Sequence, residues 1–156
     1  MRQIIIALLC WSTILSASAT EVVRDQGFEV QIQPFPSTFL TQDVAGMYSF
    51  ERSRRQALIN VVVLEVQADG QARGAVAASV TGFSKNLLGQ TQTLNFREID
   101  EGEDAIYYLA PVRVTSEEEI QIVLEVIPAN AKAIDINFKH RVYVCLLYTS
   151  PSPRDS

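Results

Sequence analysis

Few side chains in this chain could carry out catalysis or hold a metal ion. The sequence contains one histidine, His140, and two cysteines, Cys10 and Cys145. His140 falls on the same alternate positions as the apolar residues around it, which favours a packed histidine over a general base. A zinc site needs several histidine or cysteine ligands, and the run from Gly82 to Asn86 lacks the closing glycine of a serine-nucleophile turn. The sequence therefore predicts no catalytic residue, no metal site and no cofactor.

Two groups of charged residues could form ion sites. Calcium is bound by carboxylate oxygens, and five carboxylates gather near one predicted turn. They are Glu98, Asp100, Glu101, Glu103 and Asp104. Their spacing is not that of an EF-hand loop, so a solvated turn is favoured. Arg52, Arg54 and Arg55 could contact phosphate, but such a short run in an acidic chain is more typical of a solvated loop face.

The motif that most suggests a function is apolar and lies in a predicted loop. Residues 86–90 read Asn-Leu-Leu-Gly-Gln, so Leu87 and Leu88 stand where turns usually hold polar residues. The leucines either fold back to close the end of the domain or are displayed to a partner. Phe39 and Leu40 raise the same question in an earlier connection. If both segments lie at one end, these four residues could form an exposed apolar patch that contacts a partner.

The elements that position these residues are predicted to be strands. Phe28, Val30 and Ile32 alternate with polar residues, the pattern of a half-buried strand. Residues 57–67 are apolar at both parities in their middle, which is typical of a strand covered on both faces. The seven predicted strands cover residues 28–33, 57–67, 75–82, 91–99, 105–114, 119–127 and 133–143.

Seven short strands separated by turns predict one all-β domain, an antiparallel β-sandwich. One short helix is expected at residues 41–48, in the crossover between the first two strands. Thr41 is suited to cap it, and apolar residues follow at helical spacing. The predicted core residues lie on the apolar parity of their strands or in the central strand. They are Ile59, Val61, Val63, Tyr108, Ile122, Leu124, Ile136 and Phe138.

Residues 1–19 predict a cleaved secretory signal peptide. Arg2 provides a positive start, the apolar run that follows is too short to cross a bilayer comfortably, and residues 17–19 form a small-x-small cleavage site. A lipoprotein signal with Cys10 as the lipidated residue is the alternative, and the bulky residue before Cys10 disfavours it. We expect a mature chain that begins at Thr20, lies outside the cytoplasm and has no transmembrane anchor after cleavage.

Residues 145–156 break with the composition of everything before them. They resemble a sequencing adaptor translated in one reading frame, and a native Ser/Pro-rich flexible tail is the alternative. The predicted domain is then residues 20–144, which contain no cysteine and therefore no disulfide. The whole chain carries a formal net charge of −5. Because an acidic protein repels phosphate backbones, nucleic acid is not an expected partner.

Four motifs, in order along the chain, resemble one bacterial family. They are residues 37–41, residues 57–61, residues 86–90, and Glu101-Gly102 followed by residues 104–110. The family comprises small secreted proteins of Gram-negative bacteria and is known only as domain of unknown function 4426. The resemblance implies an immunoglobulin-like sandwich exported to the periplasm, and it brings no catalytic residues. Glu103 is an extra residue relative to the family pattern and is expected to lengthen an exposed turn.

Three classes of function remain open. The leading hypothesis is a non-enzymatic periplasmic interaction or accessory protein whose partner is a periplasmic protein or peptide, because no nucleophile, metal or cofactor motif is found. The second is a binding module for a small apolar ligand or an extended peptide, which a deep apolar pocket would favour. The third is an enzyme of unrecognised type, which would require a cleft with several converging titratable groups.

Overall fold

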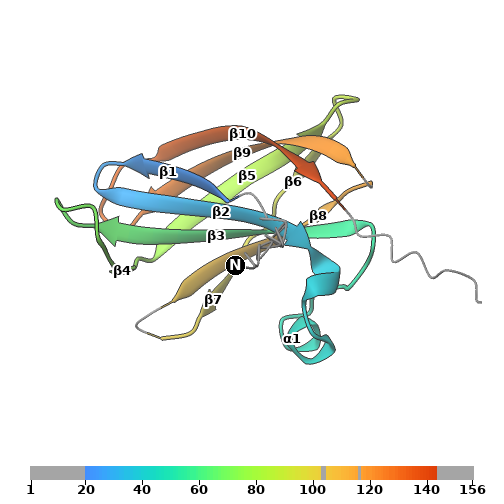
Figure 1. The fold of residues 1–156 in the computed structure, drawn as a ribbon, viewed down its shortest axis with the longest axis horizontal. Coiled ribbons are helices and arrows are strands. Elements are labelled where there is room, and N and C mark those ends of the chain that lie inside the picture. Colours follow the sequence, from blue (N-terminus) through green and yellow to red (C-terminus); the bar gives the residue numbers. More distant parts are fainter. Residues whose placement is uncertain (1–19, 103–104, 116, 144–156) are drawn as a thin grey trace, which may run out of the picture.

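The computed structural model describes residues 20–102, 105–115 and 117–143, which form two antiparallel β-sheets packed as a sandwich (Figure 1). The first sheet contains β1 (Glu21–Asp25), β2 (Phe28–Pro36), β3 (Gln56–Val66), β4 (Ala72–Ala75), β7 (Arg97–Asp100) and β8 (Ile106–Arg113). The second contains β5 (Ala78–Asn86), β6 (Thr91–Thr93), β9 (Glu118–Pro128) and β10 (Ile134–Val142). The predicted immunoglobulin-like β-sandwich is confirmed. The predicted signal peptide, residues 1–19, and the tail, residues 145–156, lie outside the described residues.

The strand order explains which segments share a sheet. The first sheet runs β1-β2-β3-β8-β7, with β4 paired to the last residues of β3. The second sheet runs β10-β9-β5-β6. All of these neighbours are antiparallel. The long apolar strand β3 is thus paired on both of its edges, which agrees with its prediction as a central strand.

The main core lies between the two sheets and is built from alternate residues of each strand. In β9, Ile120, Ile122, Leu124 and Val126 are all buried, while the residues between them are more exposed. Seven of the eight predicted core residues are buried. The exception is Phe138, which packs against the core but is only partly buried. It belongs to the edge strand β10, which has a neighbouring strand on one side only.

The buried Tyr108 connects the two sheets through its hydroxyl group. The hydroxyl donates to Oε2 of Glu98 at 3.0 Å and accepts a hydrogen bond from the backbone N–H of Ala78, in β5 of the other sheet, at 2.7 Å. Burial raises the pKa of this hydroxyl, and the carboxylate of Glu98 adds to the rise. Tyr108 is therefore a neutral structural residue at physiological pH.

Two of the predicted strands are each divided in the structure, and one strand was not predicted. The predicted strand at residues 75–82 was wrong in its bounds, because the chain leaves the first sheet after β4 and enters the second at β5. The predicted strand at residues 91–99 is likewise divided into β6 and β7, in different sheets. β1 pairs with β2 through a tight turn in which Gln26 and Gly27 both have positive φ. The part of the chain that the structure describes therefore has ten strands where about seven were expected.

The crossover segment, residues 37–55, connects β2 to β3 and contains both helical elements. The first is η1 (Ser37–Phe39), a turn of 3-10 helix, and the second is α1 (Gln42–Met47). Thr41 caps α1 as predicted, since its Oγ1 accepts a hydrogen bond from the N–H of Val44 at 3.3 Å. The crossover segment lies at one end of the first sheet (Figure 1), and its residues Leu40, Tyr48 and Phe50 pack against part of the outer face of that sheet. A second apolar cluster lies there, with Phe50, Leu58, Ile99 and Leu109 buried in it.

Candidate functional site

The turn between β5 and β6, residues 86–90, has a conformation fixed by its own hydrogen bonds. The Asn86 Oδ1 accepts from the backbone N–H of Leu88 at 3.1 Å and of Gln90 at 2.9 Å. Its Nδ2 donates to Oε1 of Gln90 at 2.8 Å. Gly89 adopts a φ of 79°, which glycine tolerates without strain. We call residues 86–90 the leucine turn.

Both leucines of the leucine turn face solvent. Leu87 is 75% exposed and Leu88 is 83% exposed. The interpretation that they fold back to close the end of the sandwich is therefore wrong. The turn is closed by the Asn86 side chain rather than by apolar packing, so the leucines are left free to project outward.

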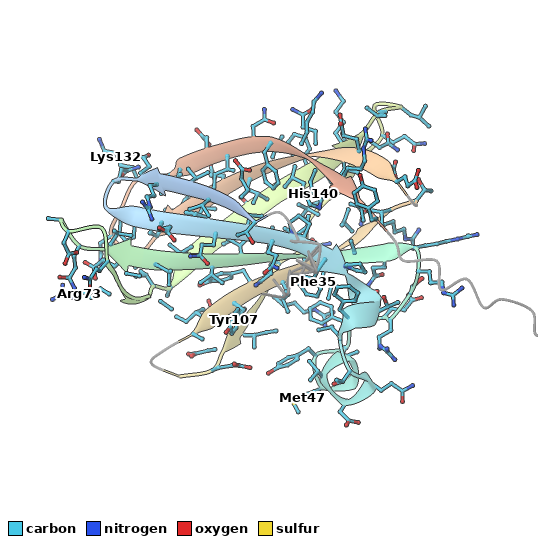
Figure 2. All side chains as sticks on the ribbon, in the orientation of Figure 1. Phe35, Met47, Arg73, Tyr107, Lys132 and His140 are labelled. Atoms are coloured by element: carbon cyan, nitrogen blue, oxygen red, sulfur yellow. The ribbon has the colours of Figure 1, made fainter. Side chains whose placement is uncertain are left out.

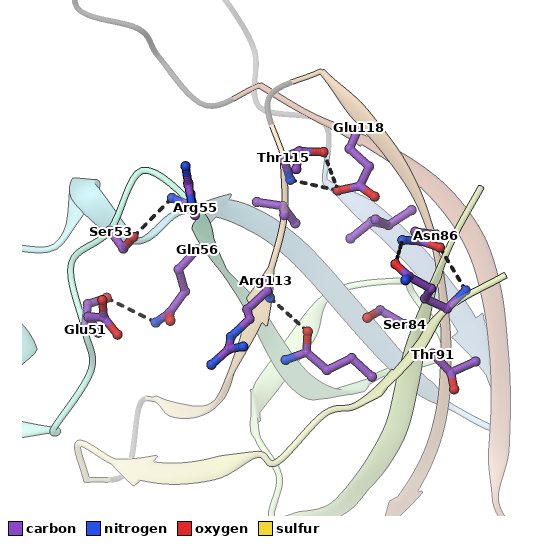
Figure 3. A pocket seen from close by; sticks show the side chains of 14 residues that line it. Glu51, Ser53, Arg55, Gln56, Ser84, Asn86, Thr91, Arg113, Thr115 and Glu118 are labelled. Carbon is purple, nitrogen blue, oxygen red and sulfur yellow. Dashed lines mark hydrogen bonds between the residues drawn. The ribbon is translucent and has the colours of Figure 1, made fainter. Parts of the chain in front are cut away.

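A hollow of about 860 Å³ lies beside the leucine turn, between the ends of the two sheets (Figure 3). Three segments line it: residues 51–56 at the end of the crossover segment, residues 84–92 around the leucine turn, and residues 113–120 where β8 leads to β9. Most of the lining side chains are polar. We call this feature the polar hollow, and its lining residues are Glu51, Ser53, Arg55, Gln56, Ser84, Asn86, Gln90, Thr91, Gln92, Arg113, Val114, Thr115, Glu118 and Ile120.

Hydrogen bonds hold much of the polar hollow in place. The Gln92 side chain accepts from the backbone N–H of Arg113 at 3.0 Å and so joins the two sheets. The Glu118 carboxylate accepts from both the N–H and the hydroxyl of Thr115, at 2.7 and 2.9 Å. Ser84 lies in β5 and is only 4% exposed. The hollow is thus an ordered polar surface with arginine and glutamate side chains on its walls.

The other predicted contact residues lie at the same end of the sandwich but outside the polar hollow. Phe39, in η1, is 65% exposed, whereas Leu40 packs against the second apolar cluster. The two segments share an end because Pro36 pairs with Ala57, next to Gln56, and Gln56 lines the polar hollow together with Asn86. Figure 1 shows the crossover segment and the yellow-green turn on opposite sides of this end. The structure therefore does not join the two segments into one apolar patch.

The histidine, the carboxylates and the arginines singled out in the sequence are dispersed over the fold. His140 lies in β10 beside Ile120 of β9, and partial burial lowers its pKa, so it is neutral at pH 7. Asp100 accepts the backbone N–H of Gly102 at 2.9 Å. Arg52 donates to the carbonyl of Thr38 at 3.1 Å. Of the five carboxylates near the predicted turn at residues 98–104, Glu103 and Asp104 lie outside the described residues.

Sequence reasoning missed the polar residues of the hollow. Ser84, Gln92 and Arg113 occupy ordinary strand positions in the sequence, and no motif distinguishes them. They come together because β5 and β8 end, and β6 begins, at one edge of the sandwich, which depends on sheet membership. The leucine turn, by contrast, could be predicted from the sequence of residues 86–90.

Comparison with known proteins identifies one matching family. The family model described as "Domain of unknown function (DUF4426)" matches residues 23–144. A crystal structure of a DUF4426 family protein from Pseudomonas aeruginosa is 31% identical in sequence, with a TM-score of 0.69. That match covers 81% of this chain and 97% of the other. No curated protein matches the chain.

Two structures of FetP from uropathogenic Escherichia coli share the fold at lower identity. A copper-bound variant of FetP is 14% identical, with a TM-score of 0.59, over 87% of this chain and 97% of that chain. FetP expressed in the periplasm of E. coli is 11% identical, with a TM-score of 0.57, over 82% and 96%. Similarity at this level concerns the fold alone. In residues 20–102, 105–115 and 117–143 of this chain, no three His, Cys, Asp or Glu side chains gather as ligands for one metal ion. None of the helices described there has the length and apolar composition needed to span a membrane.

Proposed function

We propose that this chain, which belongs to the DUF4426 family, is a non-enzymatic periplasmic interaction protein. Its partner is a periplasmic protein, and the contact is an extended segment of that protein that lies in the polar hollow and packs an apolar side chain against Leu87 and Leu88. The observation that carries the proposal is the exposure of both leucines, 75% and 83%, on a turn with fixed hydrogen bonds.

The fixed conformation of the leucine turn supports binding. A flexible loop loses conformational entropy when a partner orders it, and this loss weakens association. The hydrogen bonds of Asn86 to Leu88 and Gln90 already order this turn in the free protein. Apolar side chains presented in this way can supply much of the binding energy of an interface, since a few anchor residues usually dominate it.

The polar hollow supports an extended polypeptide as the bound segment. An extended chain exposes backbone N–H and C=O groups that require polar partners when they leave water. The hollow offers amide, hydroxyl, guanidinium and carboxylate groups, among them Gln56, Thr91 and Arg113. Its volume of about 860 Å³ accommodates several residues of such a segment.

The periplasmic location rests on the sequence of residues 1–19, which has the order of a secretory signal peptide. Cell fractionation and N-terminal sequencing test this part of the proposal. We expect a soluble periplasmic chain that begins at Thr20. An intact Met1 in the cytoplasm, or a lipid on Cys10, would contradict it.

A cross-linking experiment tests the binding site. A photoreactive residue at Thr91, in the wall of the hollow, is introduced into the wild-type protein and into the variant with Leu87→Ser and Leu88→Ser. The captured protein is identified, purified and titrated by calorimetry. We expect the double variant to keep its stability within about 0.5 kcal/mol, because both side chains are already exposed. Its affinity should fall at least about 10-fold, which corresponds to 1.4 kcal/mol.

A matched control and a second variant complete this experiment. Met47→Ser replaces another exposed apolar residue, on α1 and outside the lining of the hollow, and should leave the affinity unchanged. Asn86→Ala keeps both leucines but removes the hydrogen bonds that order the turn, so it should weaken binding by a smaller factor. A double variant that folds normally and retains full affinity would refute the proposed site.

A further inference from the structure

The longest free sheet edge among the described residues belongs to β10. This strand pairs with β9 on one side and ends the second sheet on the other. It has nine residues, whereas the other strands with a free edge, β1, β4, β6 and β7, have three to five. Figure 2 shows β10 along the upper margin of the molecule, with Lys132 just before its start and His140 toward its far end. The pairing of β10 with β9 runs through all nine residues without a bulge. A long and regular edge of this kind can accept another strand.

Alternate residues of β10 direct their backbone N–H and C=O groups toward the free edge. In antiparallel pairs, hydrogen-bonded and non-hydrogen-bonded positions alternate along each strand. The N–H of Ala129 donates to the carbonyl of Ala77 at 3.0 Å, which assigns the odd-numbered residues of β9 to the hydrogen bonds with β5. The even-numbered residues of β9 therefore bond to even-numbered residues of β10, such as Leu124 to Ile136. The backbone groups of the odd-numbered residues of β10 point away from β9, and these residues are Asp135, Asn137, Lys139 and Arg141.

The charged side chains of this edge are sorted along the strand. Near the start of β10, Asp135 lies opposite Glu125 of β9, and neither forms an ion pair within the described part of the chain. Like charges directly opposite each other in a sheet are unfavourable. Near the end of β10, Lys139 and Arg141 share the carboxylate of Glu119, at 3.6 and 3.9 Å. One end of the edge is thus acidic, and the other has an excess of positive charge.

We propose that β10 pairs with β10 of a second copy of this chain, antiparallel and about a twofold axis at Phe138. A twofold interface must be self-complementary, and the two oppositely charged ends of this edge meet that condition. In this register, which overlaps all nine residues of both strands, Asp135 of each copy lies opposite Arg141 of the other. Asn137 likewise lies opposite Lys139. All four residues have free backbone groups, so the two edges can form the hydrogen bonds of an antiparallel pair.

The position of Phe138 supports the same axis. Phe138 packs against the core but is only partly buried, and it lies on the strand that has no neighbour on its far side. At the axis it faces Phe138 of the second copy in a non-hydrogen-bonded pair, the kind in which side chains approach most closely. Paired aromatic rings stabilise a contact beyond the area that they bury. The second copy thus covers the part of the core that β10 leaves exposed.

Sedimentation velocity of the purified wild-type chain measures this association. The mass should rise from that of a monomer to that of a dimer as the protein concentration is raised from about 1 µM to about 1 mM, the range of weak to moderate association. Asn137→Pro should fold and remain monomeric, because proline lacks an N–H and is tolerated where that N–H faces away from the sheet. Asn137→Ala is the matched control. It loses the side-chain hydrogen bond to Gln121 but keeps the backbone N–H, so it should form dimers as the wild type does.

Two charge variants test the register independently of proline. In Asp135→Arg alone and in Arg141→Asp alone, the opposed side chains carry like charges, so each variant should form dimers at least about 10-fold more weakly than the wild type. An equimolar mixture of the two variants should form heterodimers with an affinity close to that of the wild type, because every opposed pair in the mixture then has opposite charges.

Several results would overturn the proposal. They are a wild-type chain that stays monomeric over the whole concentration range, a dimer that Asn137→Pro leaves intact, and a mixture of charge variants that associates no better than each variant alone. A photoreactive residue at Lys139 that captures a different periplasmic protein, and no second copy, would assign the edge to another partner. No residue of β10 lines the polar hollow, so this test and that of the leucine turn can fail separately.

Discussion

At the scale of single residues, two asparagines differ in how their amides are paired. Asn86 ends β5, and its side chain reaches the backbone N–H groups of the residues two and four positions later. Side chains of this type often close turns in that way. Asn60 lies within the extended strand β3, where the neighbouring backbone groups pair with β2 and β8. Its Oδ1 is buried and has no hydrogen-bond partner in the part of the chain that the structure describes.

The acidic residue Glu29 provides a test of electrostatics at this scale. It lies in β2, is 8% exposed, and accepts hydrogen bonds from Gln31 and Arg24, each at 2.6 Å. These donors hold the pKa of its carboxyl below the ordinary value of 4.5, the Gln31 contact most strongly. A lowered folded-state pKa gives stability that is present above the unfolded-state pKa and is lost as the pH falls through the folded-state pKa.

Glu29→Gln should therefore be less stable than the wild type at pH 7, and the difference should shrink as the pH is lowered through 4.5 toward 3. Urea denaturation at pH 7, 5, 4 and 3 measures the difference in the free energy of unfolding between the two proteins. Glu51→Gln, at an exposed position without an ion pair among the described residues, should change little. A constant difference between wild type and Glu29→Gln at all four pH values would contradict the assigned pKa shift.

The sequence predicts the leucine turn at this scale but not the direction of its side chains. Asn86 and Gly89 are typical turn residues, so the position of the turn could be predicted. Whether Leu87 and Leu88 point inward depends on the surface at the end of the sandwich, and polar side chains from other elements line that surface. Asn60 could have been noticed, since it is a single amide within the apolar run of residues 57–64.

At the scale of secondary-structure elements, β5 and β9 approach each other unusually closely at Gly82. Gly82 pairs with Leu124, and a Cβ atom at this position would overlap the carbonyl oxygen of Val123 and lie 2.7 Å from Cδ2 of Leu124. The absence of a side chain thus permits the register of the two strands. Backbone atoms of a central strand pair cannot move aside easily, so overpacking here is not readily relieved.

Gly82→Ala should destabilise the protein by about 1–3 kcal/mol, the usual range for an added methyl group in a packed interior. The change is measured by urea denaturation. Gly46→Ala is the matched control: a Cβ at Gly46 meets no atom within 4 Å, and the residue lies within α1. That variant should be more stable than the wild type by about 0.5–1 kcal/mol. A Gly82→Ala variant as stable as the wild type would show that the strands can separate locally.

The strands that were predicted incorrectly show the limit of periodicity at this scale. Leu94 and Phe96 have the spacing of one continuous strand, and both pack into the core. Leu94 is nevertheless held by Gly82 of β5 through a backbone hydrogen bond of 2.9 Å, whereas Arg97 begins β7 in the other sheet. The alternate residues that point into the core are the even-numbered ones both before and after the chain changes sheet. Alternation therefore indicates which residues are buried and does not indicate the sheet to which they belong.

At the scale of the whole molecule, the two sheets bury one continuous core. The all-β class could be predicted because alternation recurs along the chain, and the helix could be predicted because Thr41 caps it. The polar hollow could not, since it combines residues from three or more elements. Its assembly depends on strand order, which local sequence does not encode.

Leu124 tests the core. It is 1% exposed and lies in β9, between β5 and β10. Leu124→Ala should lower the free energy of unfolding by about 2–5 kcal/mol, because apolar contacts are lost and a cavity remains. Leu88→Ala removes the same atoms from an exposed side chain and should cost less than about 0.5 kcal/mol. Thermal and urea denaturation of the two variants measure the contrast. A Leu124→Ala cost below 0.5 kcal/mol would place this residue outside the core.

The division of strands between the sheets also determines how the molecule can open. The chain passes from one sheet to the other three times, between β4 and β5, between β6 and β7, and between β8 and β9. Neither sheet is a continuous stretch of sequence, so neither can detach while the other remains closed. Proteins often open in contiguous cooperative units that amide hydrogen exchange can resolve. Here the slowest amides of β3 and β9 are expected to exchange with a single opening free energy, equal to that of global unfolding.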